Sequence, residues 1–240
     1  MGHKMIRTVI AGGTSGIGFA IAKLSSAKNW QTTILGRNQE KLNDALWELN
    51  GTSKGMSADA TDMNAVKKVM PEIGNFDHLV VALSGNKGIG MFKDLDLAQL
   101  RQGFDEKFFA QLNIVQSALP YINSGGSITL ITAVSSQAKG TGTSGLGAIN
   151  GALEIMVPVL AKELKPVRVN AVSPGVINTA WWDFLPADKK QETFQHWAGQ
   201  TAAGRIGEPE DVANAVLSII ENTYITGQVI AVDGGLCLGG

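Results

Sequence analysis

Short apolar segments alternate with amphipathic segments along the whole chain. Runs such as "RTVIA", "QTTILG" and "FDHLVVAL" have the length of β-strands and are apolar almost throughout, which is typical of strands buried on both faces. Segments such as "IGFAIAKLSSAK" between them carry a helical apolar stripe. This strand–helix alternation predicts an α/β fold with a doubly wound parallel sheet and helices on both faces.

The amphipathic segments predict where the helices begin and end. One long helix is expected from about Leu97 to Ile122, ending near Pro120, and a second across residues 147–164, which Pro158 can kink. Asn38 is the expected N-cap of the helix that follows it, and Thr61 or Asp62 that of the next. We find no composition break, so residues 1–240 are expected to form a single domain.

An aromatic segment interrupts the alternation at residues 177–207. It contains Trp181, Trp182, Phe184 and Trp197 and shows no clear periodicity. A long irregular segment of this kind is typically functional, so we expect a lid or a wall of a pocket for a small-molecule substrate.

Composition excludes several classes of protein. The formal net charge is −1, with basic and acidic residues scattered, so the sequence predicts neither nucleic-acid nor membrane binding. No stretch approaches membrane-spanning length, and no signal peptide is evident, which favours a cytoplasmic protein. The single cysteine, Cys237, fits a reducing compartment, and we expect it to be a buried apolar residue rather than a nucleophile. His3, His78 and His196 have no metal-ligand spacing, so no metal site is expected.

A glycine-rich turn joins the first predicted strand to the first helix in "VIAGGTSGIG". Gly12 permits the tight turn, Gly16 lets the backbone approach a pyrophosphate, and Gly18 lets the helix pack closely on the sheet. Free N–H groups and the positive end of the helix dipole would then hold phosphates. The motif alone is weak and fits a plain strand-to-helix turn, but its position predicts a Rossmann-type dinucleotide site.

The second strand ends in "ILGR", with Gly36 where NAD-binding folds have an acid for the ribose hydroxyl. Arg37 follows, and its guanidinium can pair with a 2′-phosphate. We therefore expect NADP(H) in preference to NAD(H), although an exposed arginine at a helix start is the alternative.

Several longer motifs together resemble the short-chain dehydrogenase/reductase family: "AGGTSGIG", "SADATD", "VRVNAVSPGVINT", "GRIGEPEDVANAV" and "ITGQVIAVDGG". The resemblance implies that Asp59 accepts from the adenine amino group, although an acid there can instead cap a strand end. Thr179 would reach the nicotinamide carboxamide or merely cap a helix. The cofactor-binding residues implied are Gly12, Thr14, Ser15, Gly16, Ile17, Gly18, Arg37, Asn38, Asp59, Ala60, Ala82, Ser84, Asn150, Pro174, Gly175, Ile177 and Thr179.

The resemblance fails at the positions where the family carries out its chemistry. The family uses a Ser–Tyr–Lys group assisted by an asparagine. In "LITAVSS" and "GTSGLGAINGALE" the aligned positions hold Ala133, Leu146 and Asn150, and Lys107 stands at the asparagine position. Leu146 cannot donate a proton, so a substrate already polarised, such as an iminium ion or a conjugated acceptor, is favoured.

Lys107 is the candidate catalytic residue. Burial in a cleft would lower its pKa towards usefulness in acid–base chemistry, or it can hold an anionic substrate. The alternative is that Lys107 pairs with Glu106, Asp105 or Glu154, or extends into solvent. The hydroxyls of Thr132, Ser135 and Ser136 are expected to bond locally, and His196 is expected to pack beside Trp197.

Two functions remain open at this stage: an NADP(H)-dependent oxidoreductase with non-standard proton handling, or a non-catalytic NADP(H)-binding sensor, regulator or assembly subunit. Lyase chemistry is disfavoured because the glycine loop is intact and no tyrosine base is evident. Members of the family that the chain resembles commonly assemble through the two long central helices, and both helices are apolar enough here for the resemblance to imply a homodimer or homotetramer.

Overall fold

The computed structural model describes residues 5–49 and 51–238. Its described part contains a seven-stranded sheet in which all paired strands are parallel. The strand order is β3-β2-β1-β4-β5-β6-β7. The strands are β1 (Arg7–Ala11), β2 (Gln31–Gly36), β3 (Lys54–Ser57), β4 (Phe76–Val81), β5 (Ile122–Ile131), β6 (Arg168–Pro174) and β7 (Val229–Val232).

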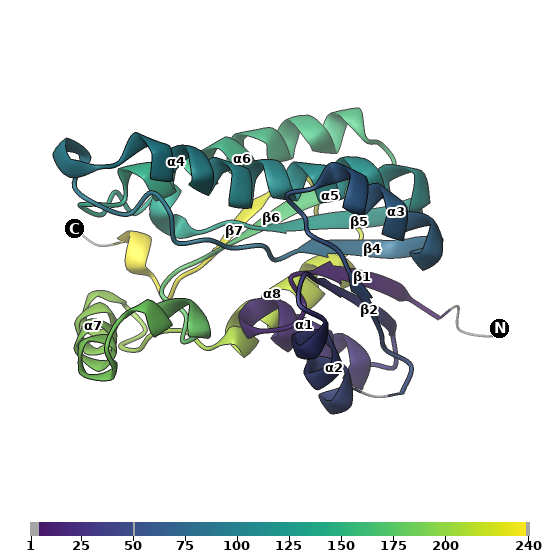
Figure 1. The fold of residues 1–240 in the computed structure, drawn as a ribbon, viewed down its shortest axis with the longest axis horizontal. Coiled ribbons are helices and arrows are strands. Elements are labelled where there is room, and N and C mark those ends of the chain that lie inside the picture. Colours follow the sequence, from purple (N-terminus) through teal and green to yellow (C-terminus); the bar gives the residue numbers. More distant parts are fainter. Residues whose placement is uncertain (1–4, 50, 239–240) are drawn as a thin grey trace.

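Helices cover both faces of this sheet, as Figure 1 shows. One layer holds α1 (Gly16–Ala27), α2 (Gln39–Glu48) and α8 (Pro209–Glu221). The opposite layer holds α3 (Met63–Ile73), α4 (Leu97–Gly103), the π-helical segment η2 (Phe104–Phe109), α5 (Ala110–Ala118) and α6 (Ser144–Glu163). Each layer packs its own apolar cluster against the sheet. The predicted doubly wound α/β fold is therefore confirmed.

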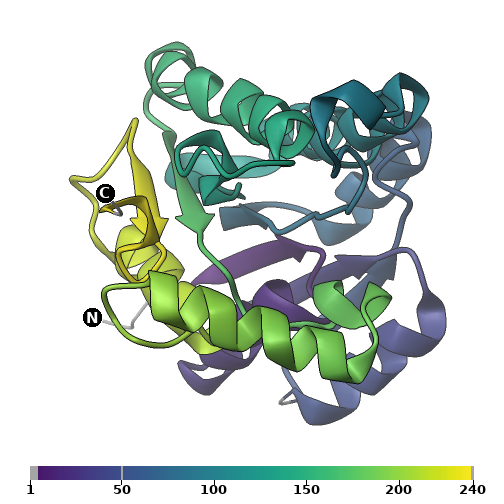
Figure 2. The ribbon, with the colours of Figure 1, turned by 90° about the vertical axis from the view of Figure 1, so that its left-hand side faces the viewer.

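The chain reverses its winding direction between β1 and β4, which lie side by side although β2 and β3 intervene in sequence. In sheets of this kind, ligands bind beyond the carboxyl ends of the strands at such a switch point. Helix α7 (Ala187–Gln200) lies at that edge, and Figure 2, which views the molecule from this side, shows α7 crossing it.

Two predicted caps have hydrogen bonds in the structure. The Asn38 side chain accepts from the backbone N–H of Lys41, and Asp62 accepts from the N–H groups of Asn64 and Ala65. These acceptors satisfy donors that a helix start leaves without partners. Of the two expected caps for α3, the structure selects Asp62.

The predicted helix at 97–122 was wrong in its regularity and its end. It divides into α4, η2 and α5, followed by a 3-10 turn, η3 (Leu119–Tyr121), and Ile122 already begins β5. A π-helical segment inserts an extra residue into the turn and often occurs at functional sites. Periodicity does not reveal it, because a single inserted residue shifts the apolar stripe only slightly.

The segment at 177–207 is more regular than the sequence suggested. It contains the 3-10 turn η5 (Ala180–Phe184) and the 14-residue helix α7. No residue of α7 is buried. A helix with no fully buried side chain carries a weak apolar stripe, which is why periodicity missed it.

The expectation that no segment reaches membrane-spanning length also needs correction. Helix α6 has 20 residues and a mean hydropathy of 1.4, so by length and composition alone it qualifies. In the fold, its Leu153 and Val157 lie in the apolar cluster that packs on the sheet, and Pro158 lies within the helix. Packing in the core therefore accounts for these apolar side chains of α6.

Candidate functional site

A cavity of about 960 Å³ opens beyond the carboxyl ends of the strands. It is lined by every residue that the sequence analysis assigned to cofactor binding or catalysis, although these residues come from segments far apart in the chain. They are Gly12, Thr14, Ser15, Gly16, Ile17, Gly18, Arg37, Asn38, Asp59, Ala60, Ala82, Ser84, Lys107, Asn150, Pro174, Gly175, Ile177 and Thr179.

The glycine turn between β1 and α1 has no space for side chains. Gly12 has a φ of +81°, and a Cβ there would lie 2.6 Å from the carbonyl oxygen of Ala82. A Cβ on Gly18 would overlap the carbonyl oxygen of Gly12. These contacts hold α1 close to the sheet, as a dinucleotide fold requires.

The N-terminus of α1 faces the cavity without a side-chain cap. Ser15 occupies the cap position but makes no capping hydrogen bond, and the first turn carries no acidic residue. Ser15, Gly16 and Ile17 all line the cavity. Uncapped N–H groups at a helix start favour a bound anion, so this end fits the pyrophosphate of a dinucleotide.

The end of β2 carries cationic side chains and no acid. A Cβ on Gly36 would lie 2.7 Å from Cγ2 of Thr14, so an acid there would require the Thr14 side chain to shift. Arg37, Asn38 and Lys41 line this side of the cavity, and Arg37 forms no ion pair among the described residues. The two cationic side chains fit a 2′-phosphate. Lys41 was not identified from the sequence, because it lies a full turn into α2.

Asp59 makes the local contacts of a strand-end cap. Its Oδ1 accepts from the backbone N–H of Thr61 at 2.9 Å and from the Thr61 hydroxyl at 2.8 Å. These hydrogen bonds hold the pKa of Asp59 below its usual value, and the charge of Arg37 adds to the effect. The carboxylate still lines the cavity, so the capping role and an adenine contact are compatible.

Asn150 supplies a buried acceptor at the opposite end of the cavity. Its side chain is 2% exposed, and its Nδ2 donates to the Ser135 hydroxyl at 3.0 Å and to the Leu146 carbonyl at 2.9 Å. Because the Leu146 carbonyl requires a donor, the amide orientation is determined. Oδ1 is left buried without a partner and fits a hydroxyl donor such as a ribose.

Lys107 is buried in the wall of the same end. Its side chain is 7% exposed, and Nζ donates to the Thr132 carbonyl at 3.3 Å. Burial lowers its pKa to about 8, although the charge of Glu154 acts in the opposite direction. Within residues 5–49 and 51–238, Lys107 forms no ion pair, so neither expected alternative, direct pairing with an acid or extension into solvent, describes it.

Gln111, one helical turn beyond Lys107, was missed by the sequence analysis. Its side chain is fully buried, and Nε2 donates to the carbonyls of Leu83 and Ile131 at 3.3 and 3.1 Å. These two carbonyls lie at the ends of neighbouring strands. Gln111 therefore fixes the helical segment that carries Lys107 over the sheet edge. A buried glutamine in a helix has no sequence signature.

The remaining wall around Lys107 is apolar at the positions where proton donors were sought. Ala133 and Leu146 both line the cavity there. The Thr132 and Ser136 hydroxyls donate to Glu154, and the Ser135 hydroxyl accepts from Asn150. The expectation of bonds to local backbone holds only for Ser136, whose hydroxyl also lies 3.2 Å from the Ala133 carbonyl; otherwise these hydroxyls bond side chains of α6.

Aromatic side chains close the cavity from the η5–α7 side. Trp181, Trp182 and Trp197 line it, and the Trp181 Nε1–H donates to the Gly85 carbonyl at 3.1 Å. Trp182 Nε1 donates to the Ile177 carbonyl at 3.0 Å. The Thr179 hydroxyl accepts from the Trp181 N–H, so it does cap η5. Trp181 and Trp182 therefore pack against each other and also form part of the cavity wall.

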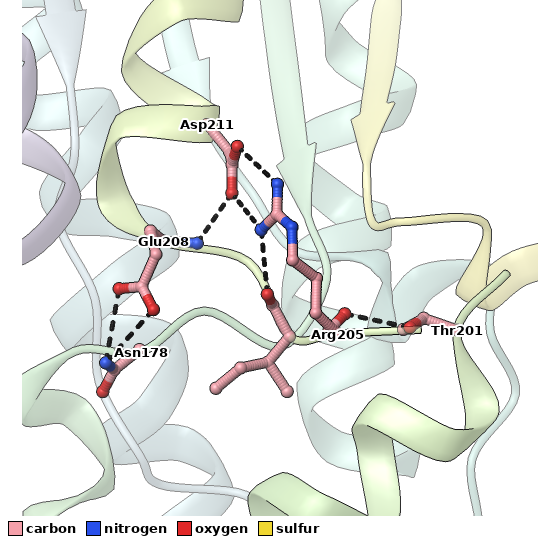
Figure 3. A network of polar contacts seen from close by, with 6 residues as sticks. Asn178, Thr201, Arg205, Glu208 and Asp211 are labelled. Carbon is pink, nitrogen blue, oxygen red and sulfur yellow. Dashed lines mark hydrogen bonds and ion pairs between the residues drawn. The ribbon is translucent and has the colours of Figure 1, made fainter. Parts of the chain in front are cut away.

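Polar contacts hold both ends of the segment 177–207 to the start of α8, as Figure 3 shows. Asn178 donates to the Glu208 carboxylate at 3.3 and 3.4 Å. Arg205 makes a two-point contact with Asp211 at 2.6 and 2.9 Å, which lowers the pKa of Asp211 to about 2. The segment 204–216, which carries one of the family-like motifs, therefore anchors residues 177–207 to α8.

Two side chains considered from the sequence do not line the cavity. His196 is exposed and packs against Trp197, with ring centroids 5.4 Å apart, as expected. Cys237 is half-buried rather than buried, and burial together with Asp233 raises the pKa of its thiol to about 11. A thiol with that pKa is a poor nucleophile at neutral pH.

Comparison with known proteins identifies the family. The family described as "Enoyl-(Acyl carrier protein) reductase" matches residues 11–237. Carbonyl reductase family member 4 of Xenopus laevis is 33% identical, covering 95% of this chain and 97% of its own. The 3-oxoacyl-[acyl-carrier-protein] reductase of Mus musculus is 31% identical, covering 95% and 97%. A small-chain dehydrogenase solved in complex with NADPH is 34% identical, with a TM-score of 0.86 over 98% of this chain and 100% of its own. The chain belongs to the short-chain dehydrogenase/reductase family.

Proposed function

We propose that the protein is an NADP(H)-dependent oxidoreductase in which Lys107, and not a Ser–Tyr–Lys group, handles the proton. The observation that carries this proposal is a buried ammonium in the cavity wall beside Ala133 and Leu146, neither of which has a side-chain donor. Relatives named as carbonyl and 3-oxoacyl reductases support the reaction class. The neighbour solved with NADPH, together with Arg37 and Lys41, supports the cofactor.

The residues present fit an NADP(H) molecule from end to end. The uncapped start of α1 would hold the pyrophosphate, Arg37 and Lys41 the 2′-phosphate, and Asn150 Oδ1 a ribose hydroxyl. When bound, the nicotinamide supplies a hydride. The chain's own part is to hold the acceptor at this end, exclude water with Trp181 and Trp182, and deliver a proton from Lys107 Nζ.

The side chains of the cavity wall around Lys107 favour a hydride acceptor that is already polarised. A positioned general acid contributes roughly 10²–10⁴ in rate, and an unactivated ketone would rely on one fully. A conjugated carbonyl spreads the negative charge over an enolate, which an ammonium can stabilise and protonate. A cationic iminium needs no proton, but it would lie beside the Lys107 charge. A conjugated carbonyl is therefore the proposed substrate class.

Stopped-flow measurement of NADPH oxidation tests this proposal. A panel of ketones, conjugated enones and cyclic iminium ions would be compared for the wild type and for Lys107→Met. We expect enones to react fastest, and Lys107→Met to lower kcat/KM at least roughly 100-fold with NADPH affinity unchanged. The matched control is Lys93→Met, since Lys93 is exposed on the surface.

Two results would contradict it. Unaltered turnover in Lys107→Met would remove Lys107 from the mechanism. Tight NADPH binding without turnover of any compound would favour the second candidate, a non-catalytic NADP(H)-binding sensor, regulator or assembly subunit. The observation that supports this second candidate is again that neither Ala133 nor Leu146 has a hydroxyl group to donate a proton.

The homodimer or homotetramer predicted from the sequence stays a prediction. Exposed apolar side chains lie on η2 and α6, at Phe109, Ile155 and Val159, with 51%, 72% and 50% exposure. Sedimentation velocity of the wild type beside Ile155→Glu would test whether this face joins two copies of the chain.

A further inference from the structure

Glu154 of α6 holds the most concentrated set of hydrogen bonds near the reacting end, yet it does not line the cavity. Three hydroxyl groups converge on its carboxylate. Thr132 and Ser173 donate to Oε1, both at 2.8 Å, and Ser136 donates to Oε2 at 2.6 Å. A carboxylate that accepts hydrogen bonds from three hydroxyls is held in a single orientation as an ionised acceptor.

The three donors belong to segments that form the cavity floor. Thr132 follows β5, Ser136 ends the 3-10 turn η4 (Val134–Ser136), and Ser173 precedes Pro174 at the end of β6. Glu154 therefore ties two strand ends and the turn around Ala133 to α6. An apolar residue at 154 would leave three hydroxyls without this acceptor.

The same carboxylate is linked to Lys107 through one residue. Thr132 donates to Glu154 through its hydroxyl and accepts from Lys107 Nζ through its carbonyl. Glu154 also acts on Lys107 through space, since its charge opposes the effect of burial. A fully desolvated ammonium requires such a nearby counter-charge to stay protonated at neutral pH.

The other ionisable groups around Lys107 are less suited to this role. Glu106 is its chain neighbour and lines the cavity, where it accepts from Gln102 Nε2 at 2.6 Å, and Asp105 is exposed. Cys237, on which the charge of Glu154 also acts, carries a thiol whose pKa is raised to about 11, so it is neutral at pH 7. Among the described residues, Glu154 is the acid that combines a fixed orientation with a charge acting on Lys107.

We propose that Glu154 is a positioning residue for Lys107: its carboxylate, held by three hydroxyls behind the cavity wall, is the counter-charge of the Lys107 ammonium and fixes the strand end that bears its acceptor carbonyl. The catalytic use of this ammonium rests on the proposed function, but the charge pairing does not. The conservative change Glu154→Gln removes the charge at nearly constant size.

The test measures the protonation of Lys107 directly. Pulse labelling with acetic anhydride across pH 6–11, read by mass spectrometry of the Lys107 peptide, reports the free-amine fraction. We expect Glu154→Gln to shift the midpoint down by roughly one pH unit. Glu154→Asp should restore it, and Glu163→Gln, an exposed acid on the same helix, should leave it unchanged. The alkaline limb of kcat/KM should move by the same amount.

A second measurement covers the case in which Glu154→Gln folds poorly. The Lys107→Met/Glu154→Gln double variant removes both charges, so we expect it to have a higher melting temperature than Glu154→Gln alone. An unshifted labelling midpoint in Glu154→Gln, a larger shift in Glu106→Gln, or no recovery in the double variant would each overturn the proposal. Absence of turnover on every substrate would instead overturn the proposed function, because labelling and melting need no substrate.

Discussion

The two ends of the cavity are built by different means. The end around Gly12, Gly16 and Gly18 is formed mainly by close backbone contacts and by the uncapped start of α1. One ten-residue stretch of the chain supplies both. At the end around Lys107, side chains from η2, α6, β5, β6 and η5 converge. The contrast indicates that the glycine turn is built by one local stretch of the chain, whereas the surroundings of Lys107 are built by the assembled fold.

Gly18→Ala should break the first end most severely. The new Cβ would overlap the Gly12 carbonyl oxygen and force α1 away from the turn. We expect NADPH affinity to fall by roughly 100-fold, about 2.7 kcal/mol, as measured by isothermal titration calorimetry. Gly51→Ala is the control, since a Cβ at that position meets nothing within 4 Å. NADPH binding within twofold of the wild type would show that the close approach is not required.

Arg37→Ala would sharpen the comparison at the same end. Loss of one charge-assisted contact with the 2′-phosphate should weaken NADPH binding by roughly tenfold and leave NADH binding unchanged. Titrations with both dinucleotides would measure the difference, with Arg101→Ala, an exposed arginine of α4, as control. Equal weakening for both dinucleotides would mean that Arg37 does not recognise the phosphate.

Lys107→Met should stabilise the folded protein, because it removes a buried charge. Because burial lowers the pKa of Lys107 from 10.5 to about 8, the unfolded chain binds more protons than the folded chain between these values. The free energy of unfolding attributable to this group therefore rises with pH across that window. We expect the variant to be more stable than the wild type at pH 7, by several degrees in melting temperature, with the difference shrinking towards pH 10.5. A constant difference across this range would rule out the linkage.

Asp211→Asn should have the smallest effect, on the lid alone. The substitution weakens the ion pair with Arg205. This ion pair is partly exposed to solvent, so it contributes little to global stability. We expect a severalfold faster proteolytic cleavage within residues 177–207, with Glu192→Gln, from an exposed ion pair of α7, as control. In the wild type, the Asp211 contact should weaken as pH falls from about 4 towards its pKa of about 2. Unchanged cleavage would mean that other contacts hold the lid.

Local signals in the sequence were sufficient for most of the fold. The continuous apolar strands predicted a parallel sheet because strands covered on both faces have no polar side, and Asn38 marked the start of α2 by its capping oxygen. The π-helical segment and α7 were missed, because one inserted residue and a half-exposed helix leave almost no periodic signal. Gln111 was not recognised, and Glu154 was considered only as one of three possible partners of Lys107, because their hydrogen-bond partners lie in segments distant in sequence.

By itself, the sequence determined the α/β class, the glycine turn, the cationic end of β2 and the residue types at positions 133, 146 and 150. These follow from chain-local rules of period, backbone freedom and charge. Only the tertiary structure decided that, within the described part of the chain, Lys107 is buried without an ion pair, Asn150 has an unused acceptor, and Glu154 is held by three hydroxyls behind them. Desolvation and hydrogen bonding depend on which distant segments meet, and no local pattern encodes that.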